Sequence, residues 1–166
     1  MILRHQYPKG AMTMCIKLNP KYRAELLGSE RVKNYVLGGN GVVTLTSDVS
    51  GEHHTYSFQT PNNNPYADKK FDDDVIFIRT LADSDVWIYV GMYKGGRFKL
   101  TAKSNFKIDS PTVKGIAYIF KMILNPDYAD ERMHLLHEGI CCKCGRPLTN
   151  PESIELGIGP VCAEKD

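Results

Sequence analysis

The chain has 166 residues, of which 42% are hydrophobic and 24% are charged, so its length fits about one domain with enough apolar residues for a core. It contains no apolar run of about 18 residues and its N-terminus lacks a secretory signal pattern, which argues against a membrane-spanning or exported protein. The net charge of +2 is too small to indicate a partner. We therefore expect a cytoplasmic protein, in which closely spaced cysteines are more often metal ligands than disulfides.

The predicted strands lie in the middle of the chain. The first forty residues are weakly patterned, apart from a short helix that we expect after Asn19 in PKYRAELLG. Two β-type runs at 42–46 and 54–60 flank the turn residues SDVSG and predict a hairpin. After an exposed loop at 61–74, the runs VIFIRTL, VWIYVGMY and RFKLTAK alternate with the turns ADSD and KGG. Residues 42–103 are thus predicted to form an antiparallel sheet of about five strands.

Two helices are expected after the sheet. Ser110 can cap the first, Pro111 suits its first turn, and Asn125 and Pro126 end an apolar pattern with helical spacing. A second helix is expected over 128–137, before Gly139. We predict an α+β fold: an antiparallel sheet covered by a helix, with a small C-terminal zinc-knuckle module of treble-clef or ribbon-like type. The predicted units are 1–126, with a weakly patterned extension at 1–40, and 127–166.

A cluster of cysteines near the C-terminus indicates a metal site. Cys141 and Cys144 form a Cys-x₂-Cys-Gly turn, in which two thiolates reach one ion while backbone N–H groups bond the first sulfur. Cys162 follows GIGP, and Pro160 in a first helical turn would place this thiol at the start of a short helix. The expected metal is a single structural Zn²⁺, which takes four tetrahedral nitrogen or sulfur ligands.

The fourth ligand and the remaining thiol leave alternatives open. His137 lies four residues before Cys141 and is the preferred fourth ligand, with His134 as the second choice. The side chain of Cys142 should point away from a metal held by its neighbours, although it could replace one of them. A closed Cys₃His site would be structural, with a metal-binding free energy of about 10–16 kcal/mol in small zinc domains.

The segment that carries these cysteines has few apolar residues to form a core of its own. Thr149 and Glu152 predict about one helical turn that ends at Gly157. The metal would therefore replace a hydrophobic core that consists of little more than Ile140, Leu148, Ile154, Leu156, Ile158 and Val161.

The C-terminal motif CxxCGRPLTNPESIELGIGPVC resembles a family of small zinc-binding domains of unknown function that recurs in bacteriophage proteins and at the ends of some bacterial proteins. The resemblance implies zinc and a phage-like origin, and no agreed activity. A His-Glu-Gly before the knuckle, as at 137–139, also occurs in the phage versions. Two stretches farther forward, LGGNGVVTLTSDVSGEHHTYSF and FKLTAKSNFKIDSPTVKG, more loosely resemble the β-rich front of such phage proteins. The matching positions are Cys141, Cys144, Gly145, Arg146, Leu148, Thr149, Pro151, Ser153, Gly157, Gly159, Pro160 and Cys162.

A basic stretch indicates a nucleic-acid interface. Between Tyr93 and Lys107 the chain has no acidic residue, and aromatic residues alternate with the cations. Such a strand face could follow a phosphate backbone and stack bases, although a solvated outer face is the ordinary alternative. Residues 1–35 add seven Lys or Arg against two Glu. The predicted nucleic-acid-binding residues are Lys94, Arg97, Lys99, Lys103 and Lys107.

A second interpretation is a protein-binding module that inhibits or modulates a host bacterial protein. It is favoured by the acidic residues Asp72, Asp73 and Asp74 and by the C-terminal segment, where 137–166 has five acidic against three basic residues. Neither region suits a phosphate backbone. No nucleophile elbow, P-loop or dinucleotide fingerprint occurs, so we expect a non-enzymatic protein that acts in the cytoplasm of its host.

Overall fold

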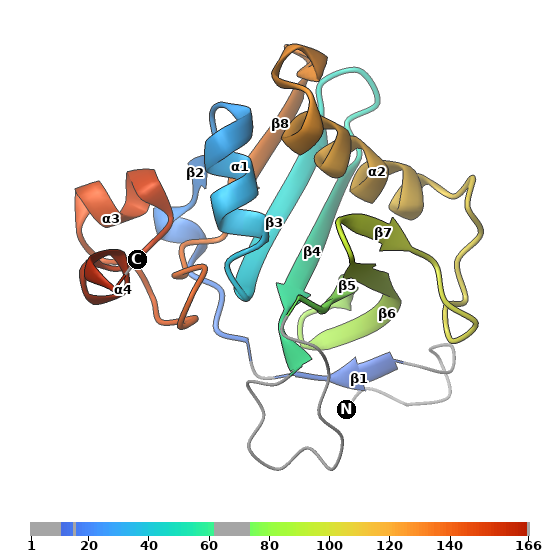
Figure 1. Cartoon of the computed structure of the whole chain (residues 1–166), viewed down its shortest axis with the longest axis horizontal. Helices are drawn as coiled ribbons and strands as arrows, with labels where there is room; N and C mark the ends of the chain where they lie inside the picture. The colour runs from blue at the N-terminus through green and yellow to red at the C-terminus, as the bar shows by residue number, and fades with distance from the viewer. Residues whose placement is uncertain (1–10, 15, 62–73, 166) are drawn as a thin grey trace.

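The computed structural model describes residues 11–14, 16–61 and 74–165 (Figure 1). Asp72 and Asp73 of the predicted acidic loop lie outside these residues. No helix in the described parts of the chain is long and apolar enough to cross a membrane. The strands are β1 (Ala11–Thr13), β2 (Ala24–Glu25), β3 (Asn40–Ser47), β4 (His53–Gln59), β5 (Ile76–Asp83), β6 (Val86–Lys94), β7 (Arg97–Lys99) and β8 (Met133–His137). The helices are α1 (Ser29–Val36), α2 (Pro111–Leu124), α3 (Pro151–Leu156) and α4 (Pro160–Glu164), with short 3₁₀ turns η2 (Pro20–Tyr22) and η4 (Pro126–Tyr128).

All strands belong to one antiparallel sheet, which confirms the predicted sheet. Its order is β1-β6-β5-β4-β3-β8-β2, and β7 pairs with β6. The predicted hairpin is formed by β3 and β4, with Val43 opposite Tyr56, and β5 and β6 are the central apolar runs. The sheet thus extends beyond the predicted strands at both edges, because β1, β2 and β8 come from segments for which no strand was predicted.

The helix predicted over 128–137 is wrong, because this segment contains η4 and then β8. Met133, Leu135 and His137 alternate along the strand toward the buried interior, whereas His134 and Leu136 point the other way. Pairing with β3 leaves Leu135 only 2% exposed. This burial favours a strand over the helix that the local propensity of the segment predicted. As a result, residues 133–137 are part of the main sheet, and the cysteine-rich segment begins only after them.

The N-terminal segment also differs from the prediction. The helix expected after Asn19 is limited to η2, and the chain then extends into β2, which pairs with β8 at the edge of the sheet. A helix that the sequence did not predict, α1, follows Gly28. Its buried residues Val32, Tyr35 and Val36 recur with helical spacing, so the pattern was present in the sequence.

The two longer helices lie on the same face of the sheet (Figure 1). The prediction for α2 is confirmed: the Ser110 side chain accepts a hydrogen bond from the Val113 backbone N–H, and Pro111 occupies the first turn. Ile116 and Ile119 of this helix pack at 0% exposure in the main core. Each such side chain contributes roughly 1.5–3 kcal/mol through burial.

The opposite face of the sheet is covered by an extended segment. Trp87 is 1% exposed there and forms a smaller apolar cluster with Val42 and Ile140. Met14, Ile16 and Leu18 pack against this cluster. Because Ile140 directly precedes the first cysteine of the knuckle, this second cluster ties the C-terminal segment to the body of the sheet.

Candidate metal centre

The knuckle is a tight loop that begins at Cys141, four residues after the end of β8. The Cys141 N–H donates to the Arg146 carbonyl (2.8 Å), and the Gly145 N–H donates back to the Cys141 carbonyl (2.9 Å). Gly145 has a φ of 76°, a left-handed conformation that glycine adopts without a Cβ clash. The loop is closed by an antiparallel bridge between Ile140 and Pro147. Backbone bonds therefore fix the positions from which the thiols project.

Three thiols meet at one point beside this loop. The sulfur atoms of Cys141, Cys144 and Cys162 all lie within 4.8 Å of one another. Cys141 is buried, Cys144 is exposed and Cys162, in the first turn of α4, is half-buried. The predicted start of a short helix at Pro160 is confirmed. This spacing of sulfurs is small enough for a single ion to contact all of them, so the cluster could hold a metal ion.

Backbone N–H groups surround the sulfur of Cys141. The N–H groups of Gly159 (3.3 Å) and Lys143 (3.4 Å) donate to it. Burial raises the pKa of the Cys141 thiol, but the N–H groups of Cys144, Gly159 and Lys143 outweigh it and bring that pKa below its ordinary value. The N–H donors therefore stabilise a thiolate, the form in which sulfur binds metal.

The Cys162 thiol has the opposite tendency. Burial, followed by its contacts with the sulfurs of Cys144 and Cys141, raises the pKa of Cys162 to about 11. Without a cation, one thiolate in the cluster thus makes the deprotonation of a second thiol unfavourable. A bound metal ion removes this conflict, because its charge stabilises all of the thiolates at once.

Cys142 points away from the cluster, as expected. It is 3% exposed and belongs to the main hydrophobic core. A Cβ at Gly38 would lie only 2.9 Å from its sulfur, so α1 and the knuckle approach each other closely here. Cys142 therefore attaches the knuckle to the body, and its neighbours on either side supply the sulfurs of the cluster.

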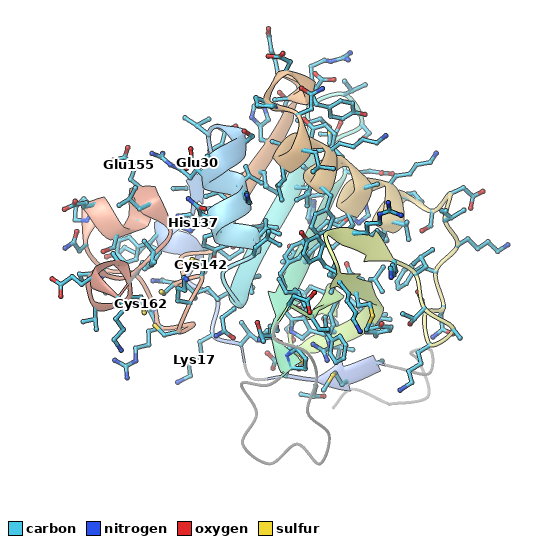
Figure 2. All side chains as sticks on the ribbon, viewed as in Figure 1. Lys17, Glu30, His137, Cys142, Glu155 and Cys162 are labelled. Carbon is cyan, nitrogen blue, oxygen red and sulfur yellow. The ribbon has the colours of Figure 1, made fainter. Side chains whose placement is uncertain are left out.

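The structure does not bring His137 to the thiols. Its Nε2 donates to the Ile154 carbonyl (2.5 Å) and its Nδ1 accepts from the Gly139 N–H (3.0 Å). The ring is fully buried and stacks on Tyr35 with centroids 5.4 Å apart, and burial lowers its pKa. Figure 2 shows His137 toward α1 and Cys162 on α4. The expected Cys₃His arrangement is thus not assembled here, and His137 instead orients the chain on both sides of the knuckle.

His134, the second choice for the fourth ligand, lies elsewhere on β8. Its Nδ1 is 2.8 Å from Glu25 Oε1 and its Nε2 is 2.9 Å from Asp48 Oδ2. These carboxylates come from β2 and from the turn after β3. Hydrogen bonds to Glu25 and Asp48 raise the pKa of His134. This histidine therefore links three segments at the surface and takes no part in the thiol cluster.

Tyr35 and Gly157 join the cysteine-rich segment to α1. The Tyr35 hydroxyl donates to the Ile140 carbonyl (2.9 Å), and the Cys142 N–H donates to the Gly157 carbonyl (3.0 Å). Gly157 ends α3 with a φ of 74°, and a Cβ there would lie 2.5 Å from Tyr35. α3 is capped by Asn150, whose side chain accepts from the N–H groups of Glu152 and Ser153. The predicted single turn that ends at Gly157 is confirmed, with Asn150 instead of Thr149 as its cap.

Glu138, which was not among the site residues predicted from the sequence, connects the end of β8 to the sheet. Its side chain is 2% exposed and accepts from Arg23 Nη2 (2.9 Å) and from the Thr44 hydroxyl (2.5 Å). The sequence did contain a signal for this buried carboxylate, because Glu138 is an acidic residue within an apolar stretch that leads into the knuckle. Because a buried carboxylate is costly unless it is paired, this network fixes the direction in which the chain leaves the sheet.

The five predicted nucleic-acid-binding cations are all exposed. Lys94 ends β6, Arg97 and Lys99 lie on β7, and Lys103 and Lys107 lie in the loop before α2. Within the residues that the structure describes, Arg97, Lys99, Lys103 and Lys107 form no ion pair. Their charges thus remain available to a ligand.

The aromatic residues between these cations are not available for base stacking. Tyr93, Phe98 and Phe106 are half-buried and pack against the main core. Tyr93 and Phe98 both stack on Phe120 of α2, with ring centroids 5.0 Å and 6.1 Å away. The expectation that these aromatic side chains stack on bases is therefore not supported. Of the predicted nucleic-acid interface, only the attraction between the exposed cations and phosphates remains.

Comparison with known proteins finds a family match at the C-terminus. Residues 132–165 match the model of a family of unknown function (DUF6011). The matched stretch begins just before β8 and includes every cysteine of the thiol cluster. No curated protein and no solved structure matches the chain. The C-terminal segment is thus similar to a family whose function is unknown, and its cysteine cluster is the feature with recognisable chemistry.

Proposed function

We propose that the thiol cluster holds one structural zinc ion and that the protein is a non-catalytic binding protein. Cys141, Cys144 and Cys162 would supply three thiolates, and thiolate sulfur favours zinc over magnesium or calcium. The N–H groups of Lys143 and Gly159 donate to Cys141 Sγ and would hold this ligand in place around the ion. The observation that carries this proposal is the meeting of these sulfurs within 4.8 Å.

Metal content measured on the purified full-length chain tests the zinc proposal. We expect about one zinc per chain by elemental analysis and native mass spectrometry. A Cys144→Ser, Cys162→Ser double variant should lose the metal. Cys142→Ala is the matched control, because it removes a neighbouring thiol that lies outside the cluster. Zinc retained by the double variant, or lost from the control, would contradict the assignment.

The proposed binding partner is nucleic acid, contacted through the exposed cations at 94–107. The supporting observation is that the cations of β7 and the following loop form no ion pair within the described residues. Since Tyr93 and Phe98 are used by the core, the contact would be made mainly with phosphates and would depend little on base sequence. The resemblance of the C-terminus to phage domains supports an accessory protein of phage origin that acts in the cytoplasm of a bacterial host.

Salt dependence tests this function. Binding of labelled single-stranded DNA, double-stranded DNA and RNA should weaken steeply between about 50 and 200 mM salt. Arg97→Glu with Lys99→Glu should weaken binding by tenfold or more, roughly independent of sequence. Lys121→Glu, on the exposed side of α2, is the matched control and should change binding little. Affinity that does not respond to the β7 charge reversals would exclude this interface.

A groove beside the metal centre favours a second candidate, binding of a host protein. This groove of about 770 Å³ lies between α1 and the C-terminal segment, and Leu27 and Leu156 line it while 64% and 43% exposed. Exposed apolar side chains of this kind suit an amphipathic helix of the partner. A photo-crosslinker at position 156, with Val49 on the β3–β4 turn as the control position, tests it in the host. A product that persists after Leu27→Asp, or that forms equally from position 49, would exclude the groove.

A further inference from the structure

A second cavity, away from the metal centre, has the composition of a small-molecule site. It has a volume of about 600 Å³ and is lined by the β3–β4 hairpin, the N-terminal half of α2 and the segment between α2 and β8. These segments meet at one end of the sheet (Figure 1). Sites for small ligands typically have volumes of about 300–1,000 Å³ and combine apolar walls with a few polar groups. The cavity fits both criteria.

Aromatic and aliphatic side chains form part of its walls. Tyr118 and Tyr128 contact each other at one side, with ring centroids 5.7 Å apart. Leu45 and Met133 line the cavity from neighbouring strands of the sheet. Rings and a thioether present flat, polarisable surface, which favours a planar ligand over an aliphatic chain or a sugar.

Four polar groups around these walls have hydrogen-bonding capacity to spare. His54 Nε2 is enclosed and makes no hydrogen bond, although its ring stacks on Tyr56. The Tyr118 hydroxyl accepts from the Asp130 N–H (2.9 Å) and keeps its own proton for donation. Within the described residues, Glu52 and Lys114 form no ion pair. An acceptor, two donors and an imidazole thus line one cavity.

From this arrangement we propose that the cavity binds a nucleobase. A nucleobase is planar, and its edge carries donors and acceptors side by side, which matches the carboxylate of Glu52 and the donors of Lys114 and Tyr118. The opposite charges of Glu52 and Lys114 favour a ligand edge that is neutral overall. An aliphatic ligand would leave His54 Nε2 and both charged groups without partners, which is unfavourable in a partly enclosed site. The base belongs either to a free nucleoside or nucleotide or to a nucleic-acid strand.

Titration of the isotope-labelled full-length chain with each of the common ribonucleosides, followed by NMR, tests the proposal. We expect saturable shifts of the His54, Tyr118 and Met133 signals with at least one nucleoside. A dissociation constant on the order of 0.1 mM is expected for a ligand of this size. Ribose alone is the control ligand and should cause no shift. Absence of shifts in the cavity with all nucleosides, or equal shifts with ribose, would overturn the proposal.

Variants in the cavity wall distinguish specific recognition of the base from non-specific binding. His54→Phe keeps a ring beside Tyr56 but removes both nitrogens, and Glu52→Gln removes the carboxylate charge. Each should weaken nucleoside binding about tenfold, the effect of losing one good polar contact. His53→Phe is the matched control, because this neighbouring residue is exposed and does not line the cavity. Unchanged binding in both wall variants would contradict the proposal.

A short single-stranded oligonucleotide distinguishes the two sources of the base and separates this inference from the proposed function. Shifts in the cavity with the oligonucleotide as well as with nucleosides would identify the base as part of a strand. If nucleosides shift the cavity signals and the oligonucleotide shifts no signal at all, the cavity site is supported with a free nucleotide as its ligand. The proposed binding of nucleic acid then loses its support. Shifts confined to 94–107, with none in the cavity for either ligand, would overturn the cavity site and leave the basic interface intact.

Discussion

The sheet body and the C-terminal cysteine-rich segment are stabilised in different ways. The body buries Val43, Phe58, Ile78, Ile116 and many other side chains in one continuous core beneath α1 and α2. In residues 138–165, the buried apolar side chains of the described chain are Ile140, Leu148 and two cysteines. Leu156 and Val161 of the same segment are largely exposed.

This contrast shows where metal and where apolar burial should matter. The C-terminal segment replaces a core with backbone hydrogen bonds, left-handed glycines and a thiol cluster. Contacts made by Tyr35, Cys142 and Glu138 then attach it to the body. We expect removal of the metal to loosen the segment, and loss of core volume to weaken the body.

Metal removal should have the largest effect and should be local. Stripping the ion with a strong chelator under reducing conditions removes a binding free energy of about 10–16 kcal/mol, by analogy with zinc-finger peptides. Amide hydrogen exchange in 139–165 should then accelerate by orders of magnitude, whereas amides of β3 to β6 should stay protected. Global unfolding of the body on chelation, or unchanged exchange in the segment, would break the comparison.

Phe58→Ala should destabilise the body without affecting the metal. Phe58 is fully buried, and its ring meets Phe120 edge-on at 6.1 Å. Truncation should lower the free energy of unfolding by about 3–5 kcal/mol, measured by denaturant titration. Zinc content should stay at its wild-type value. Val49→Ala, at a 70% exposed apolar position, is the control and should change stability little.

His137→Phe should separate hydrogen bonding from metal ligation. The new ring can still stack on Tyr35, but the Ile154 carbonyl and the Gly139 N–H lose their partners. We expect stability to fall by about 2–4 kcal/mol, the cost of two buried groups left unpaired. Zinc per chain should remain unchanged. Loss of zinc in this variant would return His137 to the ligand set predicted from the sequence.

The smallest effect should come from pH and should be confined to the edge of the body. Hydrogen bonds to Glu25 and Asp48 raise the pKa of His134. The folded state therefore holds the proton more tightly than the unfolded state. The stabilisation is fully present below about pH 6.5 and is lost as pH rises through the higher folded-state pKa of His134. NMR titration of the His134 ring should report this pKa, and Asp48→Asn should lower it; a pKa at or below the ordinary value would contradict the prediction.

Much of the sheet was predictable because alternation and turn residues act locally. The pairing of β3 with β4 and of β5 with β6 follows from apolar runs separated by SDVSG and ADSD. Likewise α2 has its cap, its first-turn proline and its apolar stripe in one continuous stretch. The segment at 128–137 was misassigned because local helix propensity was overridden by pairing with β3, a partner far away in the chain.

The thiol cluster was predictable for a similar reason, and its surroundings were not. A Cys-x₂-Cys-Gly turn and a Gly-Pro-x-Cys each specify their own geometry, so the meeting of Cys141, Cys144 and Cys162 could be expected. The position of His137 depends on Tyr35 and Ile154, which come from other elements. Spacing along the chain alone could not reveal that both ring nitrogens bond to the backbone.

The position of β8 also has a consequence for how the protein is made. Among the strands that the structure describes, β8 is the last in chain order, yet it lies between β3 and β2. Until it emerges, β3 keeps an unpaired edge that could join another chain. Pairing between segments so far apart in sequence is also slow to form. The pairing of β3 is therefore completed only after residues 133–137 have been synthesised, and a ribosome-bound chain that stops before residue 133 should be especially prone to aggregate.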